Sequence, residues 1–155
     1  MNTYEKLQEE ACKDGIEVVD YPFESERIKG LYCDGTIAIR DNIATTTEKA
    51  CVLAEELGHH YTSVGNIIDM DSSSNRKQER QARLWAYNKQ IGFKGLIRAY
   101  EHGCTASHEI AEYLDVTEEA LQECIEFYRD KYGEYKTVEH YIIFFIPHLA
   151  VLKKI

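Results

Sequence analysis

The stretch TTTEKACVLAEELGHHYTSV, residues 45–64, decides the fold, because it combines a helix start with a two-sided residue pattern. Thr45 and Glu48 have the spacing of a capping box, which predicts that a helix begins here. On a period of 3.6 residues, one face of this helix is apolar and should point into the core. That face is formed by Ala50, Leu53, Ala54, Leu57, Tyr61 and Val64.

The opposite face of the same helix carries potential metal ligands. Glu55 and His59 are four residues apart and therefore stack on one side, with Glu56 beside them. This is the spacing of the HExxH zinc helix, in which the residue after the first ligand is a general base. Here a Glu occupies the first position. Alone, the pattern also suits a solvent-exposed face, and Glu56 with His60 would have the same spacing.

A second helix, over residues 76–91, supplies a third candidate ligand. One of its faces is formed by Ala82, Trp85, Ala86 and Lys89. Glu79 borders that face, and the small Ala side chains would let this helix approach the first one closely. The alternative is a surface carboxylate paired with one of three arginines, Arg76, Arg80 or Arg83. Because Glu55 and His59 offer two further ligands, the interpretation of Glu79 as a ligand is favoured.

Composition indicates one compact domain, residues 1–155, in the cytoplasm. The net charge of −9 argues against nucleic-acid binding, because phosphate contacts need an excess of Lys and Arg. The five cysteines are scattered and odd in number, which is typical of reduced thiols in the cytosol. No secretory signal and no apolar run of the ~20 residues needed to cross a bilayer are present, so no membrane contact is expected.

The remaining patterns predict an α+β fold that is mainly helical. A helix over residues 2–13, a strand over 16–19 and a hairpin at Asp34-Gly35 place a small antiparallel sheet before the 45–64 helix. Residues 65–75 are expected to form a polar loop between the two helices, and residues 1–91 together form a core segment.

Two further segments follow the core segment. Residues 92–133 resemble a helix-turn-helix with Thr117 as an N-cap, and their carboxylates favour a packing or protein-binding module over DNA binding. Residues 134–155 form an apolar tail, in which residues 141–146 are expected to be a buried strand that forms a hairpin with residues 135–138.

Two segments carry a family resemblance, LAEELGHHYTSVGN at residues 53–66 and NRKQERQARLWAYNKQIGF at residues 75–93. They resemble the corresponding segments of the ImmA/IrrE metallopeptidases. In that family a HELGHH-type helix precedes an E-x-x-A-x-x-F-A helix that carries the third metal ligand. Glu79, Ala82, Trp85 and Ala86 match the second pattern. The resemblance implies a minimal zincin-like fold, the metal ligands Glu55, His59 and Glu79, and Glu56 as the catalytic base.

The resemblance also implies a function. It is that of a metal-dependent endopeptidase that cleaves a helix-turn-helix repressor of a phage or integrative element. One divalent metal ion is expected, zinc first, with Mn²⁺ or Fe²⁺ as alternatives because Glu55 adds a second carboxylate. The alternative function is a metal-binding, catalytically weak regulator that binds a repressor. Tyr61 and the histidines are the candidates for stabilising the oxyanion.

Overall fold

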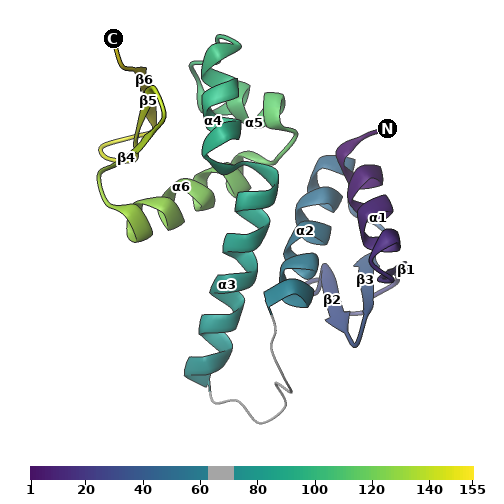
Figure 1. Cartoon of the computed structure of the whole chain (residues 1–155). Helices are drawn as coiled ribbons and strands as arrows, with labels where there is room; N and C mark the ends of the chain where they lie inside the picture. The colour runs from purple at the N-terminus through teal and green to yellow at the C-terminus, as the bar shows by residue number, and fades with distance from the viewer. Residues whose placement is uncertain (63–71) are drawn as a thin grey trace. The chain divides into compact units, whose positions relative to one another are not determined.

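The computed structural model describes residues 1–62 and 72–155, which are mainly helical and include two small sheets (Figure 1). The expected α+β class is confirmed. The chain divides into two compact units, Met1–Ala86 and Tyr87–Ile155. The boundary lies within helix α3 (Ser72–Gln90), close to residue 91, where the core segment was expected to end.

Two helices of the first unit begin at capping residues. Helix α1 (Thr3–Lys13) starts after Asn2, whose Oδ1 accepts a hydrogen bond from the Glu5 N–H at 2.8 Å. Helix α2 (Thr46–Thr62) starts after Thr45, whose Oγ1 accepts from the Glu48 N–H at 3.1 Å, as the capping pattern predicted. The Glu48 carboxylate accepts from Lys29 Nζ at 2.6 Å and so ties the helix start to the segment before strand β2.

The first sheet has the order β1-β3-β2, with β1 at Glu17–Tyr21, β2 at Gly30–Cys33 and β3 at Thr36–Arg40. The antiparallel hairpin of β2 and β3 is confirmed, and its turn residues Asp34 and Gly35 both have positive φ, 47° and 84°. The prediction of a fully antiparallel sheet is wrong for strand β1, because β1 pairs in parallel with β3 and the sheet is therefore mixed. The chain passes from β1 to the far edge of the sheet before β3 fills the middle, and residue alternation carries no signal for such a crossover.

The core of the first unit lies between the sheet and helices α1 and α2. The helix α2 positions Ala50, Leu53, Ala54 and Leu57 are buried, as predicted. Tyr61 departs from that prediction, since it is 42% exposed. Its ring stacks on Trp85 with 5.0 Å between centroids, and its hydroxyl donates a hydrogen bond to Asp14 Oδ2. Val64 lies outside the described residues.

Helices α2 and α3 approach each other closely at Gly58 and Ala82. A Cβ atom added to Gly58 would lie 2.2 Å from the Ala82 carbonyl oxygen, so only glycine suits this position. Helix α3 begins at Ser72, so residues 72–75 are helical and not part of the expected loop. The rest of that loop, residues 65–71, lies outside the described residues.

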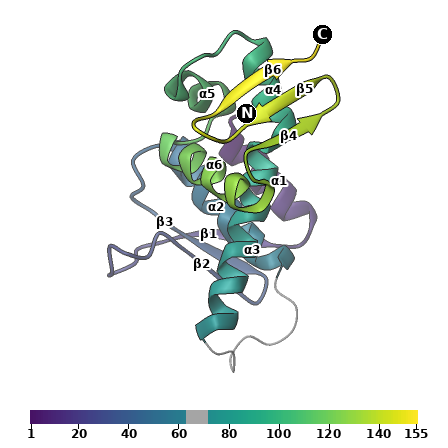
Figure 2. The same cartoon turned by 90° about the vertical axis from the view of Figure 1, so that its left-hand side faces the viewer.

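The second unit contains helices α4 (Gly92–Glu101), α5 (Ser107–Leu114) and α6 (Glu118–Tyr132). Thr117 caps α6, because its Oγ1 accepts from the Ala120 N–H at 3.1 Å. Strands β4 (Tyr135–Val138), β5 (Tyr141–Phe144) and β6 (Ala150–Lys153) then form an antiparallel sheet in that order (Figure 2). The β4–β5 hairpin was expected, whereas β6 was not. Among the described residues, no helix is long and apolar enough to cross a membrane.

The close approach at Gly58 predicts that replacing this helical glycine with alanine lowers the stability of the protein. Helix propensity alone would make Gly58→Ala stabilising by about 1 kcal/mol. The clash with the Ala82 carbonyl instead predicts destabilisation by at least about 2 kcal/mol, measured by chemical denaturation. Adding Ala82→Gly should not rescue the variant, because the obstructing atom belongs to the backbone. A Gly58→Ala protein as stable as wild type would contradict this packing.

Candidate metal centre

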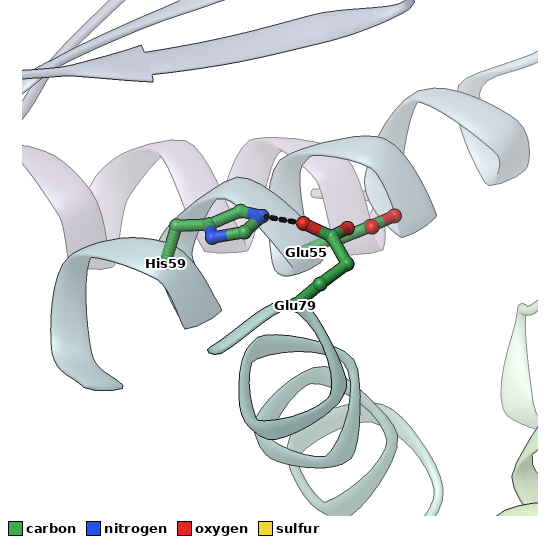
Figure 3. Close-up of side chains that lie close together, drawn as sticks. All are labelled: Glu55, His59 and Glu79. Atoms are coloured by element: carbon green, nitrogen blue, oxygen red, sulfur yellow. Dashed lines mark ion pairs between the residues drawn. The ribbon is translucent and has the colours of Figure 1, made fainter. Parts of the chain in front are cut away.

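Three side chains from two helices converge in the first unit (Figure 3). Glu55 and His59 project from one side of α2, and Glu79 reaches them from α3. His59 Nε2 lies 3.1 Å from Glu79 Oε2, and the three residues can offer one ligand atom each within 4.8 Å of one another. The structure therefore brings together the three residues that were expected to be ligands.

An arginine from α3 also belongs to this cluster. Arg83 Nε lies 3.1 Å from Glu55 Oε1 and 3.6 Å from Glu79 Oε1. Glu79 and Arg83 are one helical turn apart, so the backbone of α3 holds both near Glu55. The arginine pairing considered as an alternative for Glu79 is thus present in addition to the contact with His59.

The electrostatics of the cluster favour a bound cation. Burial raises the pKa of Glu55, the nearby Glu79 carboxyl raises it further, and Arg83 opposes both. Burial lowers the pKa of His59, against the opposing influence of Glu55, and this favours the neutral imidazole that a metal requires. Two carboxylates and a neutral imidazole are a donor set for a divalent ion, so these residues fit a metal.

Glu56 occupies a different environment from its neighbour Glu55. It is only 9% exposed and packs beneath β2, where a Cβ added to Gly30 would lie 3.0 Å from Glu56 Cγ. Burial raises the pKa of Glu56 to about 8, helped by the charges of Glu55 and Glu79 and opposed by a hydrogen bond from the Tyr32 backbone. The sequence placed Glu56 on the exposed polar face of the helix. It did not show that Gly30 of β2, which has no side chain, lets the strand lie directly against Glu56.

A cavity of about 530 Å³ opens beside the cluster. One wall is the segment 27–32, which includes the first residues of β2. The other wall is formed by Val52, Glu55, Glu56, His59, Glu79 and Arg83. Sequence reasoning did not identify segment 27–32 as part of the site, because strand alternation does not reveal which helix residues a strand will face.

The other candidate residues have different partners. His60 Nδ1 lies 2.8 Å from the Tyr32 hydroxyl, which also accepts from the Gly35 N–H at 3.3 Å. In the described part of the chain, the group of side chains that could hold a metal ion contains Glu55 and His59 and does not contain Glu56 and His60. Tyr61 bonds to Asp14 and is not among the residues that line the cavity, which weakens it as an oxyanion stabiliser.

Comparison with protein-family models matches residues 11–126 to the IrrE N-terminal-like domain of a peptidase family. The matched region contains the whole cluster and most of the chain. Comparisons with curated proteins and with solved structures find no match.

The raised pKa of Glu56 predicts how stability depends on pH in chelator-treated protein. The pKa of the Glu56 carboxyl is about 8 in the folded chain, whereas the usual pKa of a glutamate is 4.5. Rising pH between these values therefore ionises the unfolded chain first and reduces stability. Glu56→Gln should remove this loss and exceed wild type at pH 8 by on the order of 4 kcal/mol in the free energy of unfolding, because each pKa unit corresponds to about 1.4 kcal/mol.

The measurement is urea denaturation from pH 4.5 to 8 with the metal removed. The exposed Glu112 of α5, changed to Gln, is the control, because it makes the same change of charge without burial. Parallel stability curves for wild type and Glu56→Gln would show that Glu56 does not carry this penalty.

Proposed function

The chain belongs to the IrrE N-terminal-like peptidase family, and on that premise we propose that it is a metal-dependent endopeptidase. Its metal would be held by Glu55, His59 and Glu79. The observation that carries the proposal is the convergence of these three side chains from α2 and α3, with potential ligand atoms within 4.8 Å. The cavity beside them gives a substrate access to the cluster.

The donor set supports zinc as the metal, with Mn²⁺ or Fe²⁺ as alternatives. Zinc accepts imidazole and carboxylate ligands, and a second carboxylate makes the site more favourable for harder ions. When bound, the metal would polarise the scissile carbonyl and lower the pKa of an attacking water.

We assign proton transfer to Glu56. Its carboxyl lines the same cavity as the cluster but lies under β2, so burial keeps it away from bulk water. It would take a proton from the attacking water and return it to the leaving amine. The Tyr32 backbone N–H, which bonds the Glu56 carboxylate, would hold the side chain in place.

Strand β2 supports binding of an extended peptide. It is an edge strand, because the sheet order is β1-β3-β2. The segment 27–32 leads into it and lines the cavity opposite the cluster. A peptide that added to this edge by main-chain hydrogen bonds would run past Glu56 and the cluster.

As the substrate we propose a helix-turn-helix repressor of a phage or integrative element, on the strength of the ImmA/IrrE resemblance. The second candidate function is a metal-binding regulator that binds such a repressor with little catalysis. Glu55 favours it, because an additional carboxylate reduces the Lewis acidity of a bound metal.

The ligand assignment predicts which substitutions remove metal. His59→Ala and Glu79→Ala should each weaken Zn²⁺ binding by at least about 100-fold, because each removes one of three protein ligands. Metal content of the purified proteins and competition with a chelating dye measure this. The neighbouring His60→Ala is the matched control and should keep its metal.

The register of the motif is tested in the same way. Glu55→Ala should deplete metal far more than Glu56→Ala, and the reverse order would transfer the site to Glu56 and His60. Full occupancy in Glu79→Ala would remove α3 from the ligand set.

Catalysis is tested by incubating the zinc-loaded chain with a helix-turn-helix repressor and analysing the products by mass spectrometry. Glu56→Gln should lower the cleavage rate by about 10²–10⁴-fold while retaining metal, because it keeps the shape and loses the base. Removing metal with a chelator should abolish cleavage, and adding Zn²⁺ back should restore it. Tight repressor binding without cleavage would favour the regulator instead.

A further inference from the structure

We propose that Arg83 is a built-in counterion of this metal centre, which holds Glu55 and Glu79 together without metal and lowers the affinity for the divalent ion. It is a positioning residue for the two carboxylates. The part that concerns metal affinity rests on the proposed function, whereas the pairing with the carboxylates does not.

The geometry allows Arg83 to act on both carboxylates at once. Its Nε lies 3.1 Å from Oε1 of Glu55 and 3.6 Å from Oε1 of Glu79. The other oxygen of Glu79, Oε2, faces His59 Nε2 at 3.1 Å. The guanidinium therefore contacts one oxygen of the Glu79 carboxylate, Oε1, while the other oxygen, Oε2, faces His59. Arg83 thus donates a hydrogen bond to Glu55 and forms an ion pair with Glu79, and outer contacts of this kind orient ligand carboxylates in metal sites.

The charge balance explains why an arginine is placed here. Glu55 stands where the family motif has a histidine, so the cluster contains two carboxylates where that motif has one. Arginine stays protonated at every relevant pH, and its charge offsets the additional carboxylate. With Arg83 included, the formal charge of the set equals that of two histidines and one glutamate.

This arrangement has opposite consequences for the metal-free and metal-bound states. Without metal, Arg83 relieves the repulsion between Glu55 and Glu79 and stabilises the cluster. With a divalent ion present, the same charge repels the ion. Removing the charge should therefore destabilise the metal-free protein and strengthen metal binding. A residue that only filled space would not produce both effects.

The experiment uses the full chain and Zn²⁺ as the probe. Arg83→Gln should lower the Tm of the metal-free protein by about 3 °C, a shift expected for a partly exposed ion pair. It should also tighten Zn²⁺ binding about tenfold in a dye competition assay. Arg83→Lys keeps the charge and should stay within about threefold of the wild-type affinity.

A double-mutant cycle with Glu55→Gln isolates the pairing. In that background, Arg83→Gln should lower the Tm of the metal-free protein by less than half as much, because one partner carboxylate is already gone. Equal Tm losses in both backgrounds would overturn the pairing, whether or not the protein binds metal. Unchanged or weaker Zn²⁺ binding by Arg83→Gln would overturn the effect on affinity. A wild-type chain that binds no Zn²⁺ would refute the proposed function and leave the Tm cycle as a separate test.

Discussion

The close approach of α2 and α3 at Gly58 and Ala82 is the constraint on which the candidate metal centre depends. The three candidate ligands come from both helices, so the spacing between the helix backbones decides whether Glu79 can reach His59. Gly58 lies one residue before His59, and it allows the Ala82 carbonyl to lie where a Cβ would otherwise be. Ala82 is in turn one helical turn after Glu79 and fully buried. The same few residues therefore set both the packing of the two helices and the position of Glu79, the third candidate ligand.

Sequence reasoning captured the local features of this arrangement. A period of 3.6 residues identified the buried face of α2, and the i, i+4 spacing placed Glu55 and His59 together, because both follow from helix geometry alone. The small residues of the second helix correctly indicated a close approach. These features could be predicted because each depends on residues within one or two turns of the same helix.

The features that were missed depend on contacts between distant segments. Glu56 is buried because Gly30 of β2 lies above it, and the segment 27–32 becomes a wall of the cavity for the same reason. The parallel pairing of β1 with β3 requires a crossover that leaves no trace in residue alternation. Arg83 was considered only as a rival explanation for Glu79, whereas it contacts Glu55 as well. Strand pairing and the individual side-chain partners of a residue in another element come from the tertiary structure, and a single sequence does not display them.

The proposed base and the ligand cluster are coupled through charge. The pKa of Glu56 is raised to about 8 by burial and then by the charges of Glu55 and Glu79. With this pKa, Glu56 would be mostly protonated near neutral pH in the metal-free protein, and a protonated carboxyl cannot accept a proton. A divalent cation among Glu55, His59 and Glu79 would offset both neighbouring charges and lower the pKa of Glu56 toward its usual value. Metal binding would then create the electrophile and release the base in one event. This coupling requires Glu56 to be buried beside its charged neighbours, so the strand that covers Glu56 would contribute to the proposed function as well as to folding.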